Sequence, residues 1–77
     1  MTRAEFLRAL EKELMLPDGS LKEGQSLSDI PAWDSMAAVQ FIALADEKVG
    51  LLVADNDIAK SKTVNELLTL LGDRLTV

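Results

Sequence analysis

The sequence predicts an all-α fold: a small four-helix bundle with three longer helices, one short helix and a long loop between the first and second helices. Three observations predict it. Apolar residues recur at helical spacing in three segments, and two of these segments open with a Thr-x-x-Glu motif. The one strand-like run, 51–53, is too short to form a strand. With 77 residues, the chain is expected to form a single domain, 1–77, with a small core.

The first helix is predicted near the start of the chain. Thr2 and Glu5 have the spacing of a capping box, in which each side chain accepts a hydrogen bond from the other residue's backbone amide. The sequence Pro-Asp-Gly-Ser at 17–20 is expected to end the helix. The predicted core face is Phe6, Leu7, Leu10 and Leu14, and the predicted polar face is Arg3, Arg8, Glu11 and Lys12.

A long connection without sustained periodicity follows at 17–33. Loops of this length are uncommon in compact domains and are usually functional or disordered. Four apolar residues interrupt this one, so we expect it to be pinned to the core. These anchors are Leu21, Leu27, Ile30 and Trp33.

The second helix is predicted to start at Asp34 or Ser35, since either side chain can cap the first amides, and to run to about Val49. Gly50 then suits a left-handed helix end, with Leu51 placed for the accompanying apolar contact. One apolar stripe is expected to face the core, namely Ala38, Phe41, Ile42, Ala45 and Val49. A second, narrower stripe of Met36, Val39 and Ala43 is expected to be exposed.

Two further helices complete the predicted bundle. A short one is expected near Asp55 to Ser61, with Ile58 pointing inward. The last helix has a Thr-x-x-Glu motif of its own, at Thr63 and Glu66, and Gly72 weakens its end. Its predicted core stripe is Val64, Leu67, Leu68, Leu71 and Leu75.

Composition narrows the function classes. The net charge is -5, and the stretch 34–57 alone holds five acids and one base. Because phosphate binding needs clustered Lys and Arg, we expect neither a nucleic acid nor an anionic membrane as partner, and a basic protein surface is the natural complement. The chain has no Cys and no His, which removes thiolate metal sites, the commonest general base and the commonest zinc ligand. We expect no catalytic site and no metal.

Ser35 is the candidate site residue, at a predicted helix N-terminus between Asp34 and Met36. Such a serine can simply be an N-cap. The same position also suits a covalently attached phosphate, because free amides and the helix dipole stabilise an anion there. A catalytic serine would need a base, and the chain offers neither a histidine nor a Ser-x-x-Lys motif at this position.

Two other candidates are weighed and set aside. Asp55, Asp57 and Glu66 match three positions of a calcium loop, but Ala59 and Lys60 stand where a ligand and a glycine are needed, so solvated helix-capping acids are favoured. Trp33 is interpreted as packing the end of the loop against the bundle rather than as a binding aromatic.

The segment from Leu27 to Met36, Leu-Ser-Asp-Ile-Pro-Ala-Trp-Asp-Ser-Met, together with the length, acidity and helix order, resembles the acyl carrier proteins. The resemblance implies that a phosphopantetheinyl transferase attaches phosphopantetheine from coenzyme A to Ser35, with Asp34 in the transferase recognition motif. It implies a non-enzymatic carrier of thioesters for fatty-acid, polyketide or related biosynthesis. It implies docking of enzymes with basic surfaces, and the partner-binding residues would be Met36, Val39, Ala43, Asp46, Glu47 and Ile58. Of these, Ile58 would also help to line a cargo pocket.

The chain departs from the pattern of this family in ways that predict a specialised carrier. Met36 replaces the usual leucine, and Ala32 and Trp33 stand where a glycine is common. The stretch 37–40 is uncharged where the docking helix is usually acidic, and Lys48 lies among the later acids. We therefore expect an unusual acyl or aminoacyl cargo and a dedicated pathway.

One alternative function stays open. The chain would then be a small acidic helical protein-interaction domain without a prosthetic group, in which Ser35 is only a cap. Helical patterning does not separate this alternative from a carrier, because both need an amphipathic bundle. In that alternative Met36 and Val39 would be a peptide-binding or dimer face, whereas the carrier is expected to be a monomer. A cytoplasmic protein is expected, since no signal peptide and no run of about 18 apolar residues is present.

Overall fold

The computed structural model describes residues 1–76, which form four α-helices and two short 3-10 helices. The α-helices are α1 (Arg3–Glu13), α2 (Ser35–Val49), α3 (Asp55–Lys60) and α4 (Val64–Thr69), and the 3-10 helices are η1 (Leu27–Asp29) and η2 (Gly72–Arg74). Within 1–76 there is no strand, only two isolated β-bridges. The predicted all-α class is confirmed, and no described helix has the length and apolar character to cross a membrane.

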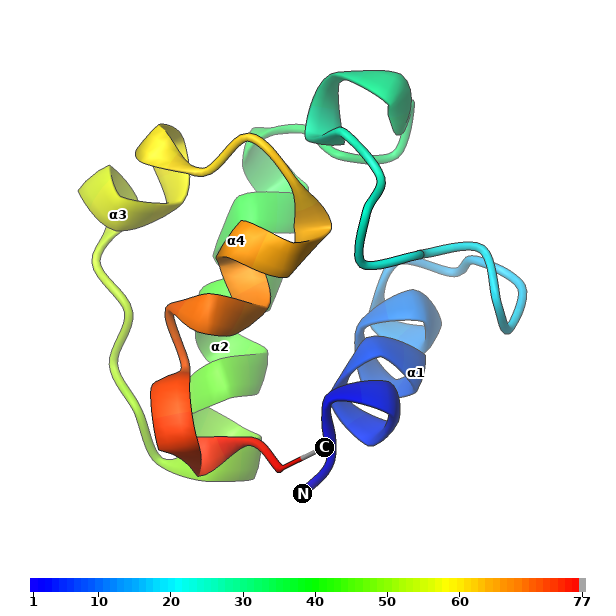
Figure 1. Cartoon of the computed structure of the whole chain (residues 1–77). Coiled ribbons are helices and arrows are strands. Elements are labelled where there is room, and N and C mark those ends of the chain that lie inside the picture. The colour runs from blue at the N-terminus through cyan, green and yellow to red at the C-terminus, as the bar shows by residue number, and fades with distance from the viewer. Residues whose placement is uncertain (77) are drawn as a thin grey trace.

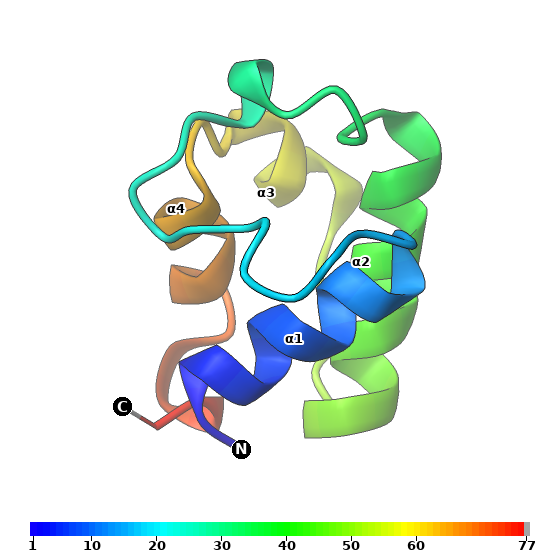
Figure 2. The same cartoon turned by 90° about the vertical axis from the view of Figure 1, so that its right-hand side faces the viewer.

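The arrangement places the two chain ends and the start of α2 at opposite ends of the molecule. Figures 1 and 2 show both termini side by side at the lower end, and the start of α2, η1 and α3 gathered at the upper end. The terminal segments are tied by hydrogen bonds from Arg3 N to Thr76 O (2.8 Å) and from Thr76 N to Met1 O (2.9 Å). The start of α2 is therefore held well away from the termini.

α1 begins as the sequence predicts. Thr2 Oγ1 accepts from Glu5 N at 3.0 Å, and Glu5 Oε1 accepts from Thr2 N at 2.8 Å, so both halves of the capping box are present. Hydrogen bonding to the Glu5 carboxylate, from the backbone amide of Thr2 first and from the Thr2 side chain second, lowers the pKa of Glu5. The helix thus gains an anion at its N-terminal end, where the dipole favours one.

The polar face predicted for α1 is wrong at Glu11, whose side chain is 0% exposed. The following loop folds back over this face, and the carboxylate accepts hydrogen bonds from Gly19 N (3.1 Å) and Leu21 N (2.7 Å). Arg8 completes the cluster: its Nη2 donates to Glu11 Oε2 at 3.1 Å, and its Nε lies 2.6 Å from Oε1 without hydrogen-bond geometry. Helical periodicity alone could not show that a loop would cover this side of the helix.

The long loop is pinned to the core as expected, because Leu21, Leu27 and Ile30 are buried and Trp33 packs against them. The loop also pairs with the α3–α4 connection through Leu27 N to Lys62 O at 2.9 Å. Two further backbone bonds, Val64 N to Gln25 O (3.0 Å) and Asn65 N to Glu23 O (2.8 Å), continue this pairing. The 3-10 turn η1 inside the loop was not predicted.

α2 runs from Ser35 to Val49 and ends at Gly50 with a left-handed φ of 67°, as predicted. Its core stripe is rotated from the predicted one. Phe41 and Ala45 are buried as expected, but Ala37 and Leu44 are buried too, whereas the remaining members of the predicted stripe are only partly buried against the core. Those partly buried residues are Ala38, Ile42 and Val49.

The prediction of three longer helices is wrong, because α4 has six residues, as α3 does. After Thr69 the chain tightens: Leu71 N bonds to Leu68 O at 3.0 Å, and Gly72 takes a φ of 55° before η2. Leu75 still reaches the core, but from beyond a 3-10 turn rather than from α4. The Thr-x-x-Glu motif is half formed, since Thr63 Oγ1 accepts from Glu66 N whereas the Glu66 carboxylate accepts from Lys62 N.

Candidate functional site

Ser35 is the first residue of α2, and the capping role belongs to its neighbour. Asp34 has extended backbone angles, its Oδ1 accepts from Ala37 N at 2.9 Å, and its carbonyl accepts from Ala38 N at 3.1 Å. Ser35 is exposed, and no hydrogen bond to its hydroxyl is found within 1–76. Of the two capping residues that the sequence allowed, Asp34 is the cap.

The first amides of α2 are available to an anion. Within the described chain, the N–H groups of Ser35 and Met36 find no acceptor, as is usual for the first turn of a helix. α2 is 15 residues long, so its dipole adds to the attraction of these amides for negative charge. A phosphate joined to Ser35 would lie beside both N–H groups.

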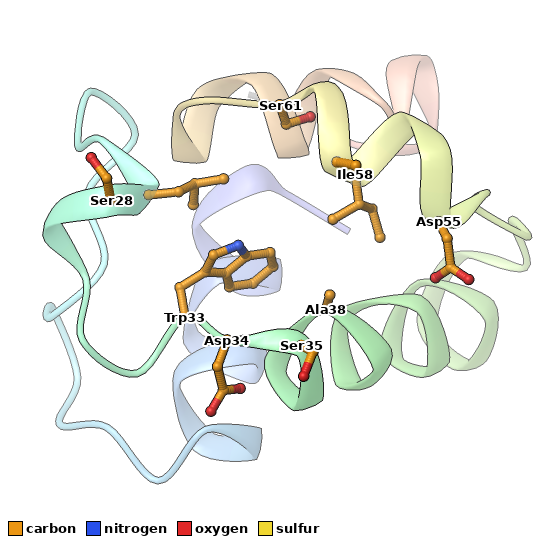
Figure 3. A pocket seen from close by; sticks show the side chains of 10 residues that line it. Ser28, Trp33, Asp34, Ser35, Ala38, Asp55, Ile58 and Ser61 are labelled. Atoms are coloured by element: carbon orange, nitrogen blue, oxygen red, sulfur yellow. The ribbon is translucent and has the colours of Figure 1, made fainter.

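A pocket of about 410 Å³ opens beside Ser35, between the start of α2, η1 and α3. Its apolar wall combines three segments that are distant in the sequence. Figure 3 shows the side chains of Trp33, Ala38 and Ile58 pointing toward one another across it, while Asp34 and Ser35 lie at its mouth and point away. The apolar lining is Leu27, Trp33, Ala38, Ile58 and Ala59.

The polar part of the lining carries negative charge and hydroxyl groups. It consists of Ser28, Asp34, Ser35, Asp55 and Ser61. No Lys or Arg lines the pocket in the described part of the chain. The cavity therefore offers carboxylates and hydroxyls around an apolar wall, with no cationic side chain to neutralise the carboxylates.

Trp33 packs the end of the loop against the core, as predicted, and it also lines the pocket. Its ring meets Phe41 edge-on with centroids 6.3 Å apart, and Phe41 meets Phe6 in the same way at 5.6 Å. This aromatic chain fixes the end of the loop to the core, as the sequence predicted. The indole is also only half-buried and forms one wall of the pocket.

The residues proposed for docking are exposed, with one exception. Met36 is 64% exposed and Val39 56%, and both lie outside the core. The remaining exposed members are Ala43, Asp46 and Glu47. Ile58 is only 5% exposed and cannot belong to this outer face; it lies in the pocket wall, the position that the resemblance also gave it.

The sequence did not identify Ser28, Ala38, Asp55 and Ser61 as a group. These residues come from η1, α2, α3 and the segment after α3, and no motif joins them. Asp55 was examined only as a calcium ligand. Within 1–76 no group of three or more His, Cys, Asp or Glu side chains is arranged to hold a metal ion. These residues come together only in the folded chain, so the sequence alone could not identify them as a group.

Other exposed apolar side chains lie outside this site. Met15 follows α1 with a left-handed φ of 60°, and Leu52, on the connection between α2 and α3, is 81% exposed. A second cavity, of about 290 Å³, lies between α3 and α4. Met15 and Leu52 do not line the pocket beside Ser35, and Ser35 does not line the second cavity.

Comparison of the chain with protein-family models, with curated proteins and with solved structures found no match. The candidate site therefore depends on its own residues and their geometry.

Proposed function

We propose that the protein is a carrier. It would hold an acyl or aminoacyl group as a thioester on phosphopantetheine attached to Ser35, and present it to enzymes of fatty-acid, polyketide or related biosynthesis. The observation that carries this proposal is the state of Ser35: an exposed hydroxyl without a hydrogen bond, at the first turn of a 15-residue helix whose cap is supplied by Asp34. A serine that served only as a cap would use its own oxygen.

The residues at the start of α2 fit the prosthetic group. The exposed hydroxyl is open to attachment, and the amides of Ser35 and Met36 suit its phosphate. When attached, phosphopantetheine supplies a flexible arm ending in a thiol, a group that this cysteine-free chain does not itself have. To be modified, Ser35 must lose its proton, and the chain has no histidine to accept it. We assign that base to the transferase.

The fixed position of Ser35 supports the same function. The loop before it is held by buried leucines and by the contact of Trp33 with Phe41. A modification enzyme and later partners would therefore meet Ser35 in one place, at the end of the molecule away from the termini (Figures 1 and 2). Holding a reacting group at a defined position removes much of the entropic cost of the encounter.

The outer face of α2 supports docking of partners next to Ser35. Met36 and Val39 expose large apolar side chains, which are favourable contacts once a partner excludes water. Asp46 and Glu47 are exposed further along the helix. An apolar patch beside carboxylates favours a partner with apolar contacts and a basic rim, which suits the transferase and the biosynthetic enzymes alike.

The same exposed side chains also favour a second candidate, an acidic helical interaction domain without a prosthetic group. In that case Met36 and Val39 would bind a partner directly, and Ser35 would have no chemistry. The two candidates differ in one property that can be measured, namely whether Ser35 accepts phosphopantetheine.

The test is intact-mass measurement after incubation with coenzyme A, magnesium and a broad-specificity phosphopantetheinyl transferase. We expect the parent protein to gain one phosphopantetheine and Ser35→Ala to gain none. Because the Asp34 cap remains, Ser35→Ala should change the free energy of unfolding by no more than about 0.5 kcal/mol. A folded parent that gains no mass, beside a control carrier that does, would leave the interaction domain as the function.

The same assay examines the docking face through the rate of loading. Met36→Glu should slow the mass gain by about tenfold or more, since a buried contact with the transferase is replaced by a charge. Leu52→Glu is the matched control, because it introduces the same charge at an exposed apolar residue outside α2. Circular dichroism should show that both variants keep their helices. Equal loading rates would remove Met36 from the docking face.

A further inference from the structure

The pocket beside Ser35 has a chemistry that bears on the cargo. An indole and an isoleucine form its apolar wall, and the carboxylate of Asp55 lies at its α3 side (Figure 3). Asp55 makes no side-chain hydrogen bond and no ion pair within residues 1–76. Asp55 is exposed, so water solvates its carboxylate; with no cationic side chain in the pocket lining, it is open to pairing with a cation that enters the pocket.

The neighbouring groups favour an ammonium as that cation. An ammonium pairs with a carboxylate, and Figure 3 shows Asp55 on the side of the pocket away from Trp33. The pocket thus offers an apolar wall at Trp33 for methylenes and a carboxylate at Asp55 for an ammonium. A wholly hydrocarbon group would bring its methylenes against Asp55 and remove water from that carboxylate without replacing it.

The size of the cavity limits the cargo. Its volume of about 410 Å³ lies near the lower end of the range for small-molecule sites, roughly 300–1,000 Å³. Trp33 lines the pocket, and its ring is packed on Phe41 of the core. The pocket therefore suits a short group rather than a long acyl chain.

We propose that this pocket receives a short acyl group bearing an ammonium, so that the cargo is aminoacyl and Asp55 determines the specificity for it. The inference rests on the proposed carrier function, because the cargo has to be joined through Ser35. Trp33 forms the wall against which the methylenes lie, and Asp55, on the opposite side of the pocket, supplies the charge for the ammonium, which a neutral cargo cannot use.

The chain provides a matched control for Asp55. Asp55 and Asp57 both lie in the first turn of α3, so each contributes in the same way to the helix dipole. Only Asp55 lines the pocket beside Ser35; Asp57 lines the other cavity. If substitution of Asp55 acted only by destabilising α3, substitution of Asp57 should have the same effect. If it acted on the cargo, substitution of Asp57 should have no such effect.

The experiment compares two cargoes of equal size on the intact protein. The transferase is supplied with the coenzyme A thioester of 3-aminopropionate or of butyrate, which differ only in an ammonium or a methyl group at the far end. Intact mass confirms loading, and the readouts are the fluorescence of Trp33, the one tryptophan in the chain, and the melting temperature. We expect the 3-aminopropionyl form to show the larger fluorescence change and to melt about 4–8 °C higher.

The variants assign the effect. Asp55→Asn should abolish the difference between the two cargoes, and Asp57→Asn should keep it. Equal fluorescence and melting of the two loaded parent forms would overturn the inference while leaving the carrier function intact, and so would a difference that persists in Asp55→Asn. A parent that gains no mass from either thioester would instead refute the carrier function, and the cargo assignment with it.

Discussion

The two walls of the pocket beside Ser35 are held in different ways. One wall, formed by Trp33 and the start of α2, belongs to a network of buried anchors and backbone hydrogen bonds. The other wall is α3, a six-residue helix whose one buried residue is Ile58. The same cavity is therefore bounded by a firmly fastened wall and a weakly fastened one. Any adjustment of the pocket to its contents should occur at α3.

The fastened wall owes its order to contacts distant in the sequence. The Glu11 carboxylate holds the amides of Gly19 and Leu21 and so fixes the beginning of the long loop. Leu27 N bonds to Lys62 O farther along the loop, and Trp33 packs on Phe41 at its end. A loop without regular structure is thereby made part of the core.

The α3 wall has few comparable supports. Its N-cap is Ala54, which has no side chain able to cap the helix, and the preceding Leu52 is exposed. Val53 and Ile58 are its buried attachments. A helix of six residues is far below the length at which helices are stable by themselves in water. α3 therefore depends on those two side chains and on the bond from Leu27 N to Lys62 O just beyond its end.

Glu11→Ala should produce the largest effect, because it removes the anchor of the fastened wall. Three charge-assisted hydrogen bonds are lost, from Gly19 N, Leu21 N and Arg8, and the buried amide of Leu21 is left unpaired. The free energy of unfolding should therefore fall by about 3–5 kcal/mol in chemical denaturation. Glu13→Ala, at an exposed acid of the same helix, should change it by no more than about 0.5 kcal/mol. Should Glu11→Ala prove too unstable to measure, Glu11→Gln keeps one acceptor and should lie between the two.

Similar costs for Glu11→Ala and Glu13→Ala would contradict the contrast between the walls. The loop would then be held by its leucines alone, and the buried carboxylate would be incidental. A drop confined to Glu11 would show that one side chain of α1 secures the segment leading to Ser35.

Ile58→Ala should have a smaller and more local effect. A buried isoleucine truncated to alanine costs about 2–5 kcal/mol in a well-packed core, and we expect about 2 kcal/mol here because α3 can separate from the rest. Amide exchange should accelerate in α3, in particular at the backbone amide of position 58, while the amides of α1 and α2 keep their protection. Uniform loss of protection over all four helices would mean that α3 opens only with the whole molecule.

The sequence predicted the features that depend on interactions between nearby residues and missed those that depend on contacts between distant segments. The cap at Thr2, the left-handed Gly50 and the exposure of Met36 depend on nearby residues, and all three were predicted. The burial of Glu11 depends on a loop that returns over α1, and no periodic pattern contains that information. α4 is short because the chain leaves the α-helix after Thr69. Gly72, with its φ of 55°, indicated a weak helix end but not that the helix would stop before it.

The residues of the candidate site also fall into two groups, those that the sequence identified and those that it did not. Ser35 and Asp34 were identified because their neighbours carry a local signature, although the roles proposed for them await experiment. The pocket was not identified, because Ser28, Ala38 and Asp55 lie on separate elements that meet only in the folded chain. Ile58 was expected to point inward, which is confirmed, but its place opposite Trp33 required the packing of α3 on α2.

The smallest expected effect comes from strengthening the weak wall. Ala54 already has the extended backbone of an N-cap, φ -80° and ψ 141°, so Ala54→Ser can cap α3 without rearrangement. A gain of about 0.5–1 kcal/mol is expected, which should slow amide exchange within α3 by roughly two- to fivefold. Ala4→Ser, at an exposed position inside α1, should leave exchange in α3 unchanged. If Ala54→Ser slows exchange no more than Ala4→Ser, fraying at the N-terminus does not limit α3, and its weakness must lie in the contacts of Val53 and Ile58.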